Sequence, residues 1–136
     1  MSHTVFLSLG TNLGDKEHNL HQAISEIQMR IGAIKAQSAF LQTAPWGFES
    51  KNSFLNAAVR VETDLSPFAV LRITQDIERH MGRTHKSAGG IYHDRIIDID
   101  ILLYDDLHLS TPELTIPHPH INERDFVLIP LSQIIQ

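Results

Sequence analysis

Ile96-Ile97-Asp98-Ile99-Asp100-Ile101-Leu102-Leu103-Tyr104 has the strongest β-strand character in the chain. Its β-branched and apolar residues predict a strand over residues 96–104. Successive side chains of a strand point to opposite faces, so Asp98 and Asp100 share one face and the isoleucines between them share the other. This segment therefore predicts a strand with an apolar core face and an acidic second face.

The segments before this strand predict alternating strands and helices. Apolar residues at helical spacing predict a helix over residues 16–31, with Asp15 as its cap. Ser66-Pro67 is a helix-start signal, and Gly82 is expected to end that helix, whose buried stripe would include Leu71, Thr74, Ile77 and Met81. Strands or extended segments are predicted over residues 4–9, 34–42 and 54–63.

The segments around and beyond the acidic strand complete the pattern. Residues 83–94 contain two adjacent glycines and few apolar residues, which predicts a long loop. A turn at residues 105–106, a short strand over 107–110, a proline-containing loop and a last helix over 124–134 follow. The order β-α-β-β-α-β predicts a ferredoxin-like α+β sandwich, an antiparallel sheet with helices packed on one face.

Composition limits the classes of function. The 136 residues are 42% hydrophobic and 20% charged, which is typical of one globular domain, expected to span residues 1–136. The formal net charge of −5 argues against a nucleic-acid partner. There is no Cys, and the apolar run after Met1 is too short for a signal sequence or a membrane span. We therefore expect a cytoplasmic monomer without a membrane partner.

Asp98 and Asp100 are the first candidate site. Side chains two apart on a strand lie about 6–7 Å apart at Cα, so both carboxylates can reach one hydrated Mg²⁺ or a pair of ions. The simpler explanation is a solvated polar face. Asp is depleted in strands, however, and like charges at neighbouring positions on one face repel unless a cation lies between them. Oxygen ligands favour Mg²⁺ over zinc, so the pair predicts a magnesium site.

Basic residues near the predicted loop are candidates for phosphate binding. Arg83 and Lys86 follow the second helix, and Arg95 and Arg124 are able to converge with them on phosphate oxygens. Taken singly, each arginine is better explained as solvated surface. No P-loop sequence is present, so a bound nucleotide would be held in another way. Trp46, in a loop with Pro45 and Gly47, is a candidate for covering a ligand.

Four short motifs occur in order along the chain: Phe54-Leu55-Asn56-Ala57-Ala58, Arg95-x-x-Asp98-x-Asp100, Thr115-x-Pro117-His118 and Arg124-x-Phe126. Their combination resembles the 6-hydroxymethyl-7,8-dihydropterin pyrophosphokinase family of folate biosynthesis. The resemblance implies a ferredoxin-like fold. It also implies transfer of the terminal pyrophosphoryl group of ATP to the hydroxymethyl group of the pterin, with release of AMP.

The resemblance also implies roles for individual residues. Asp98 and Asp100 would hold two Mg²⁺ ions on the ATP phosphates, and Arg83 and Arg95 would assist transfer. With Lys86 from the basic stretch, the residues expected to bind ATP are Gln75, Glu78, Arg83, Lys86, Arg95, Ile101, Thr115, His118 and Arg124. Those expected to bind the pterin, with Phe54 and Phe126 stacking on its ring, are Thr43, Ala44, Trp46, Phe54, Asn56 and Phe126.

Two other classes of function fit a ferredoxin-like fold. A non-catalytic module that binds a small anionic ligand is the main alternative, because this fold hosts many functions. RNA binding on the sheet is disfavoured by the acidic pair and by the net charge of −5. Release of AMP, of ADP or of neither from Mg-ATP and the pterin alcohol would separate pyrophosphoryl transfer from an ordinary kinase and from the binding module.

Overall fold

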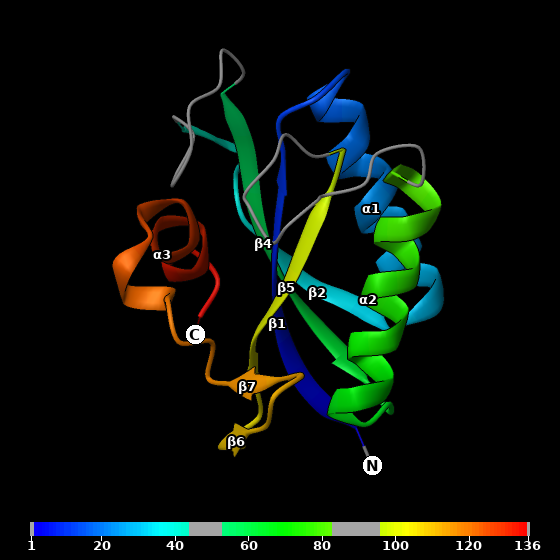
Figure 1. Ribbon diagram of the computed structural model, residues 1–136, viewed down its shortest axis with the longest axis vertical. Coiled ribbons are helices and arrows are strands. Elements are labelled where there is room, and N and C mark those ends of the chain that lie inside the picture. Colours follow the sequence, from blue (N-terminus) through cyan, green and yellow to red (C-terminus); the bar gives the residue numbers. More distant parts are fainter. Residues whose placement is uncertain (1, 44–52, 83–95, 136) are drawn as a thin grey trace.

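The computed structural model describes residues 2–43, 53–82 and 96–135 of the chain. In this part a five-stranded antiparallel sheet lies between two helices on one face and a third helix on the other (Figure 1). The predicted loops over 83–94 and around Trp46 lie outside the described residues. No helix of the described ranges is long and apolar enough to cross a membrane.

The sheet has the strand order of the predicted fold. Its strands are β1 (His3–Thr11), β2 (Ala33–Gln37), β3 (Leu41–Thr43), β4 (Phe54–Thr63) and β5 (Asp98–Tyr104). The order is β2-β4-β1-β5, with every pair antiparallel, and β3 pairs with the first residues of β4. The ferredoxin-like α+β fold is therefore confirmed. The acidic strand β5 lies at one edge of this sheet.

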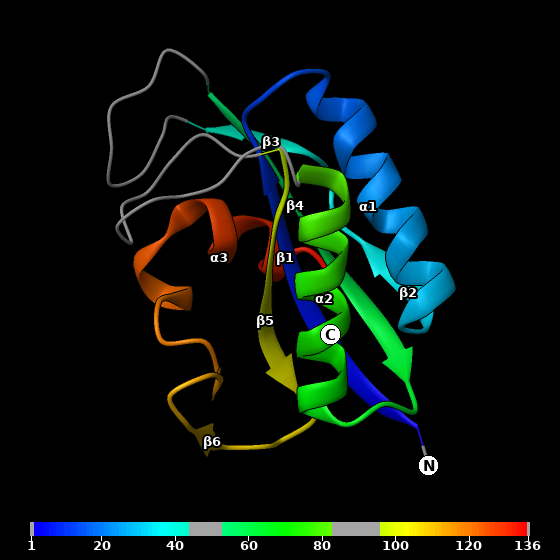
Figure 2. The same cartoon turned by 45° about the vertical axis from the view of Figure 1, so that its right-hand side comes forward.

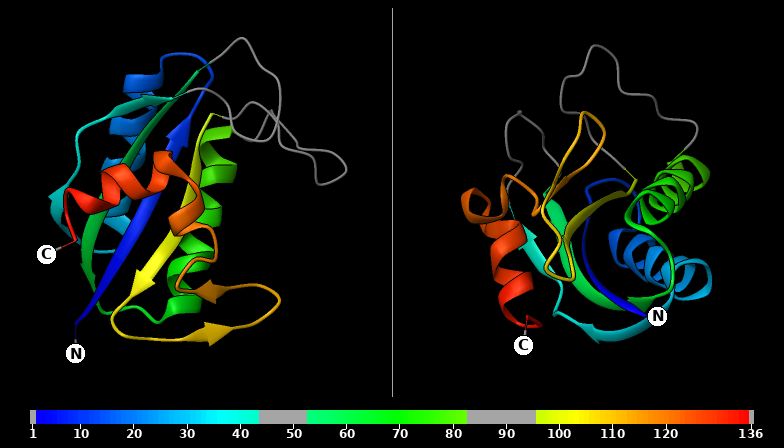
Figure 3. Two further views of the ribbon diagram at one scale, coloured as in Figure 1. Left: turned by 90° about the vertical axis from the view of Figure 1, so that its left-hand side faces the viewer. Right: turned by 90° about the horizontal axis from the view of Figure 1, so that it is seen from below.

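Two helices, α1 (Lys16–Arg30) and α2 (Pro67–Gly82), cover one face of the sheet (Figure 3). Both predicted starts are confirmed. The Asp15 carboxylate accepts a hydrogen bond from the backbone N–H of His18 at 3.1 Å, and the Ser66 hydroxyl accepts one from Ala69 at 3.2 Å. The core between helices and sheet includes Val5, Leu7, Leu9, Leu20, Ile27, Val59, Val61, Val70, Ile77, Ile99 and Ile101.

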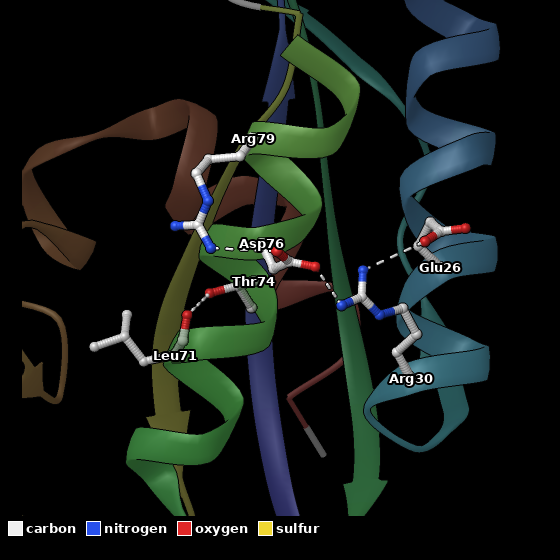
Figure 4. A network of polar contacts seen from close by, with 6 residues as sticks. All are labelled: Glu26, Arg30, Leu71, Thr74, Asp76 and Arg79. Atoms are coloured by element: carbon white, nitrogen blue, oxygen red, sulfur yellow. Dashed lines mark hydrogen bonds and ion pairs between the residues drawn. The ribbon is translucent and has the colours of Figure 1, made fainter. Parts of the chain in front are cut away.

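Polar side chains join the two helices at their outer surface (Figure 4). The Arg30 guanidinium donates to the Asp76 carboxylate at 2.5 Å, and Arg79 lies 3.2 Å from the same carboxylate. Arg30 also lies 3.6 Å from Glu26. The hydrogen bond from Arg30 holds the pKa of Asp76 below its ordinary value. These side chains are all partly exposed, so solvent screens the network and its contribution to stability is small.

The opposite face of the sheet carries a smaller apolar cluster beneath the third helix. A 3₁₀ turn, η1 (Ile121–Glu123), leads into α3 (Asp125–Ser132). The cluster, which joins α3 to β1, β4 and β5, contains Phe6, Ala58, Leu102, Val127, Leu131 and Ile134. The cluster lies on the same sheet face as Asp98 and Asp100, because Leu102 has the same parity as those two residues.

A two-stranded ribbon connects β5 to α3. It consists of β6 (Leu109–Ser110) and β7 (Thr115–Ile116), and the expected loop contains this second strand. Beyond it, the backbone N–H of His118 donates to the carbonyl oxygen of Leu102 at 2.9 Å. The segment after β7 is thereby held against the edge strand β5, which brings His118 close to the acidic face.

Two boundaries and one buried stripe differ from the sequence prediction. The predicted extended segment 34–42 is broken because the buried Ser38 accepts a hydrogen bond at its hydroxyl from the N–H of Ala58 at 2.8 Å, which interrupts the strand ladder. Strand β5 begins at Asp98 and not at Ile96. In α2, Val70 is fully buried, whereas Leu71 and Met81 are only partly buried.

Candidate active site

One row of residues crosses three strands of the sheet and forms the middle of the candidate site. Gly10 on β1 pairs with Asn56 on β4 on one side and with Asp98 on β5 on the other. Directly paired residues of antiparallel strands present their side chains on the same face. Asp98 and Asn56 therefore lie on one face of the sheet, with the position of Gly10 between them.

The next row on this face leads towards α3. Ser8 pairs with Asp100 and with Ala58, and Ala58 belongs to the apolar cluster under α3. The predicted sharing of a face by Asp98 and Asp100 is confirmed by this register. Both aspartates are partly exposed, while Ile99 and Ile101 on the opposite parity are buried. Helix α3 packs on Ala58 of this row and also contacts β3.

Asn56 is held by its neighbours on β3. Its side chain is almost fully buried, and its amide nitrogen donates to the Thr43 hydroxyl at 2.8 Å and to the Leu41 carbonyl oxygen at 3.3 Å. These two contacts use both amide protons. The amide oxygen is consequently fixed in direction and offers an acceptor on the face that carries Asp98.

Gly10 places no side chain at the centre of this face. A Cβ atom at Gly10 would lie 3.0 Å from the amide oxygen of Asn56 and 3.6 Å from a ring carbon of Phe54. The first of these distances is tighter than ordinary contact. Any side chain at this position would therefore displace the Asn56 amide, and glycine leaves the backbone of β1 as the floor between the acidic pair and Phe54.

Glu78 brings a third carboxyl group to the edge of β5. Its Oε2 atom accepts a hydrogen bond from the backbone N–H of Ile99 at 2.7 Å. Burial, followed by the nearby charge of Asp98, raises the pKa of Glu78 to about 8 from its ordinary 4.5. Asp98 also shares a hydrogen bond with the Glu78 carboxyl, and Asp100 adds to the negative field. The site thus concentrates negative charge that a cation would relieve.

His118 and Arg124 approach the same face from the segment before α3. Burial lowers the pKa of His118, and the charge of Arg124 lowers it further, while Asp98 acts in the opposite direction. The Arg124 side chain is buried, and its guanidinium carbon lies 5.7 Å from the centre of the Phe126 ring. A buried cation and a neutral imidazole near Asp98 are groups that suit a phosphate-bearing ligand.

The other residues predicted to bind ATP differ in how accessible they are to a ligand. Gln75 is exposed on α2, and Thr115 lies on β7 and is partly buried. The Ile101 side chain points into the main core, so only its backbone is available to a ligand. Three residues with predicted roles on the ATP or transfer side and two on the pterin side lie outside the described residues: Arg83, Lys86, Arg95, Ala44 and Trp46.

The sequence interpretation missed polar residues at the end of β1. Thr11 and Asn12 are almost fully buried, and the amide of Asn19 donates to the Thr11 hydroxyl at 3.3 Å and to the Leu13 carbonyl oxygen at 2.8 Å. The sequence signal for a buried polar segment was the polar Thr11-Asn12 pair directly after Gly10, at the end of the strand that carries the centre of the site.

The carboxylates fit a metal that takes few protein ligands. Among the described residues, no group of three or more His, Asp or Glu side chains is arranged to hold a metal ion. Mg²⁺ is commonly bound by one or two carboxylates, with phosphate and water oxygens completing its octahedron. The paired aspartates match that ligand set, whereas a dedicated protein cage for zinc would need more side-chain ligands.

Sequence comparisons relate the chain to enzymes of one kind. A protein from Porphyromonas gingivalis named 2-amino-4-hydroxy-6-hydroxymethyldihydropteridine pyrophosphokinase is 52% identical over 131 residues, covering 96% of this chain and 89% of that protein. The protein of the same name from Bacillus subtilis is 39% identical, covering all of this chain and 80% of the relative. The folic acid synthesis protein of Dictyostelium discoideum is 40% identical, but the match covers only 19% of its length.

Solved structures agree in fold. A crystal structure of HPPK-DHPS in complex with substrates matches 99% of this chain with a TM-score of 0.75 at 18% identity. A Plasmodium falciparum HPPK-DHPS structure matches with a TM-score of 0.79 at 16% identity. This chain spans 40% of the length of each of those chains. The model of the 7,8-dihydro-6-hydroxymethylpterin-pyrophosphokinase family matches residues 6–136, so the chain belongs to that family.

Proposed function

We propose that this chain transfers the pyrophosphoryl group of ATP to the hydroxymethyl oxygen of 6-hydroxymethyl-7,8-dihydropterin in folate biosynthesis, with release of AMP. Its family membership supports this reaction. The observation that carries the proposal is the row Asp98, Gly10 and Asn56, which brings an acidic pair and an oriented amide onto one face of the sheet. The comparisons offer no support for the non-catalytic anion-binding module.

The spacing of this row suits the two substrates. Paired residues of antiparallel strands lie about 5 Å apart at Cα, so Asp98 and Asn56 are separated by about 10 Å. That separation is comparable to the reach of a hydroxymethyl group followed by two phosphates. A pterin at Asn56 would therefore place its hydroxymethyl oxygen next to a triphosphate held beside Asp98 and Asp100.

On the pterin side, Asn56, Thr43 and the aromatic rings of Phe54 and Phe126 would bind the heterocycle. The fixed amide oxygen of Asn56 accepts from the ring edge, and the two phenyl rings stack on its faces. Ala44 and Trp46 would complete this side of the site. The site would bind the pterin in preference to an analogue that lacks the hydrogen-bond donor at the ring edge. Such an analogue would leave the buried amide oxygen of Asn56 without a hydrogen bond.

On the ATP side, Asp98 and Asp100 would hold Mg²⁺, two ions in our proposal. When bound, Mg²⁺ supplies charge neutralisation and orientation of the phosphates. His118, Glu78 and Arg124 lie near this pair and would bind the nucleotide, together with Gln75, Thr115, Lys86 and the backbone of Ile101. Arg83 and Arg95 would neutralise the charge that develops during transfer.

The reaction would be a direct displacement. The hydroxymethyl oxygen attacks the β-phosphorus, the bond from that phosphorus to the oxygen bridging to the α-phosphate breaks, AMP leaves with that oxygen, and the hydroxyl proton passes to solvent. No covalent enzyme intermediate is involved, so the chain contributes positioning and electrostatic stabilisation. We also propose that the chain acts as a monomeric single domain in the cytoplasm.

An assay of products tests the proposal. The protein is incubated with Mg-ATP and 6-hydroxymethyl-7,8-dihydropterin, and the nucleotides are separated by chromatography. Pyrophosphoryl transfer produces AMP and the pterin diphosphate in equal amounts, and omission of the pterin should abolish AMP formation. ADP in place of AMP would show an ordinary kinase, and unchanged ATP would favour the binding module; either result refutes the proposed reaction.

A further inference from the structure

The first residue of β4 lies one residue pair beyond the end of β1, at the end of an arm formed by β3 and the start of β4. Strand β1 pairs with β4 only as far as Thr11 and Leu55, and Phe54 pairs with Thr43 of β3. Strand β3 is three residues long. A short two-stranded ribbon is marginally stable in water without further packing. The arm that carries Phe54 and Thr43 therefore needs support from another element.

Lys16 provides such support from the other face of the sheet. Its ammonium group donates to the carbonyl oxygen of Ser53 at 3.2 Å and lies 3.4 Å from the Ser53 hydroxyl. The amide of Gln42 on β3 donates to the same hydroxyl at 2.9 Å. Lys16 is the first residue of α1, and Figure 2 shows that end of α1 at the same end of the molecule as β3.

Helix stability does not account for a lysine at this position. The N-terminus of a helix carries a partial positive charge, so a cation in the first turn is unfavourable. The Lys16 side chain is nevertheless partly buried and directed to Ser53. The two contacts with Ser53 therefore explain its position better than any contribution to α1.

We propose that Lys16 is a positioning residue for the pterin side of the site. It connects α1 through Ser53 to the start of β4, and Gln42 connects the same serine to β3. Phe54 follows Ser53 directly and projects to the opposite face, towards Gly10 and Asn56. Lys16 thus limits the movement of a substrate-binding ring that it does not touch. The functional part of this inference rests on the proposed function.

Steady-state kinetics tests the functional part. Lys16→Met should raise KM for the pterin by roughly tenfold, the size expected for a lost charge-assisted hydrogen bond. KM for ATP should stay within about twofold, because the side-chain contacts of Lys16 within the described residues are with Ser53 of the pterin-side arm. Lys16→Arg should restore most of the pterin affinity. Lys35→Met, at an exposed lysine of β2, is the matched control and should leave all parameters unchanged.

Hydrogen exchange tests the physical part without any substrate. Lys16→Met should accelerate exchange of the amides of residues 41–43 and 53–55 by about tenfold, while the amides of α1 and the midpoint of thermal unfolding stay close to those of the parent. Unchanged exchange in the arm, or equal acceleration throughout α1, would refute the proposal.

The kinetic and hydrogen-exchange measurements distinguish a failure of the proposed reaction from a failure of the proposed role of Lys16. If the parent releases no AMP, the proposed reaction fails, and the exchange experiment still decides whether Lys16 supports the arm. If the parent releases AMP and Lys16→Met keeps a normal KM for the pterin, the positioning role is refuted while the reaction stands. Equal rises in KM for both substrates would also refute it, because they would indicate a general structural defect.

Discussion

Glu78→Gln should stabilise the protein at pH 8.5 and have little effect at pH 5. The folded state raises the pKa of Glu78 to about 8, first by burial and then by the charge of Asp98. The unfolded chain releases that proton near the ordinary value of 4.5. The contribution of Glu78 to stability is therefore fully present below pH 4.5 and is lost as pH rises through 8.

The expected change in the free energy of unfolding follows from the pKa shift of Glu78. A rise in pKa to about 8 corresponds to about 5 kcal/mol between the two ends of this pH range. Water reaches the exposed part of the carboxyl, and Glu78 and Asp98 titrate as a coupled pair. We therefore expect a smaller change in the free energy of unfolding, about 2 kcal/mol. Glutamine has the same shape as the protonated acid, and its amide oxygen still accepts from the N–H of Ile99.

The assay is urea unfolding followed by circular dichroism at pH 5 and at pH 8.5, with EDTA present to remove divalent cations. The measured quantity is the difference in the free energy of unfolding between Glu78→Gln and the parent. Glu62→Gln, at an exposed position of β4, is the matched control. A difference for Glu78→Gln that is the same at both pH values would refute the assignment of a protonated Glu78 to the neutral folded protein.

Four further substitutions test the site and the second apolar cluster. Asp98→Asn or Asp100→Asn should abolish AMP formation while circular dichroism and the unfolding midpoint stay near those of the parent; near-normal turnover would remove the metal argument. Asn56→Ala should raise KM for the pterin by roughly tenfold, as expected for one lost hydrogen bond, and an unchanged KM would exclude Asn56 from the pterin site. Leu102→Ala should lower the free energy of unfolding by about 2–5 kcal/mol in urea titrations, because it leaves a cavity between β5 and α3; a loss below about 1 kcal/mol would show that α3 collapses onto the sheet.

Much of the fold was predictable because local signals agreed with the final packing. The helix starts at Asp15 and Ser66 rest on side-chain caps that depend only on neighbouring residues. The break at Ser38 was not predictable, since it arises from a hydrogen bond to Ala58, twenty residues away in sequence. The position of α3 on the second face likewise depends on which sheet residues remain uncovered after α1 and α2 have packed.

The candidate site was also predictable only in part. The alternation of side chains along a strand was enough to predict that Asp98 and Asp100 share a face. The raised pKa of Glu78 required knowledge of how α2 lies against the edge of β5, because the burial and the nearby charge of Asp98 that raise it come only from that packing. Sequence spacing within a helix predicts which residues share its face, but it does not predict what that face will meet.

The bare backbone at Gly10 has a consequence for inhibitor chemistry. It removes the obstacle that a side chain would place between the acidic pair and the ring of Phe54. A linker that displaced the Phe54 ring from Gly10 would meet only backbone there, and it would join a pterin-like head group to an anionic tail within a single small molecule. Resistance through Gly10→Ala would carry its own penalty, because the added methyl group that blocked the linker would also displace the Asn56 amide that we propose binds the pterin.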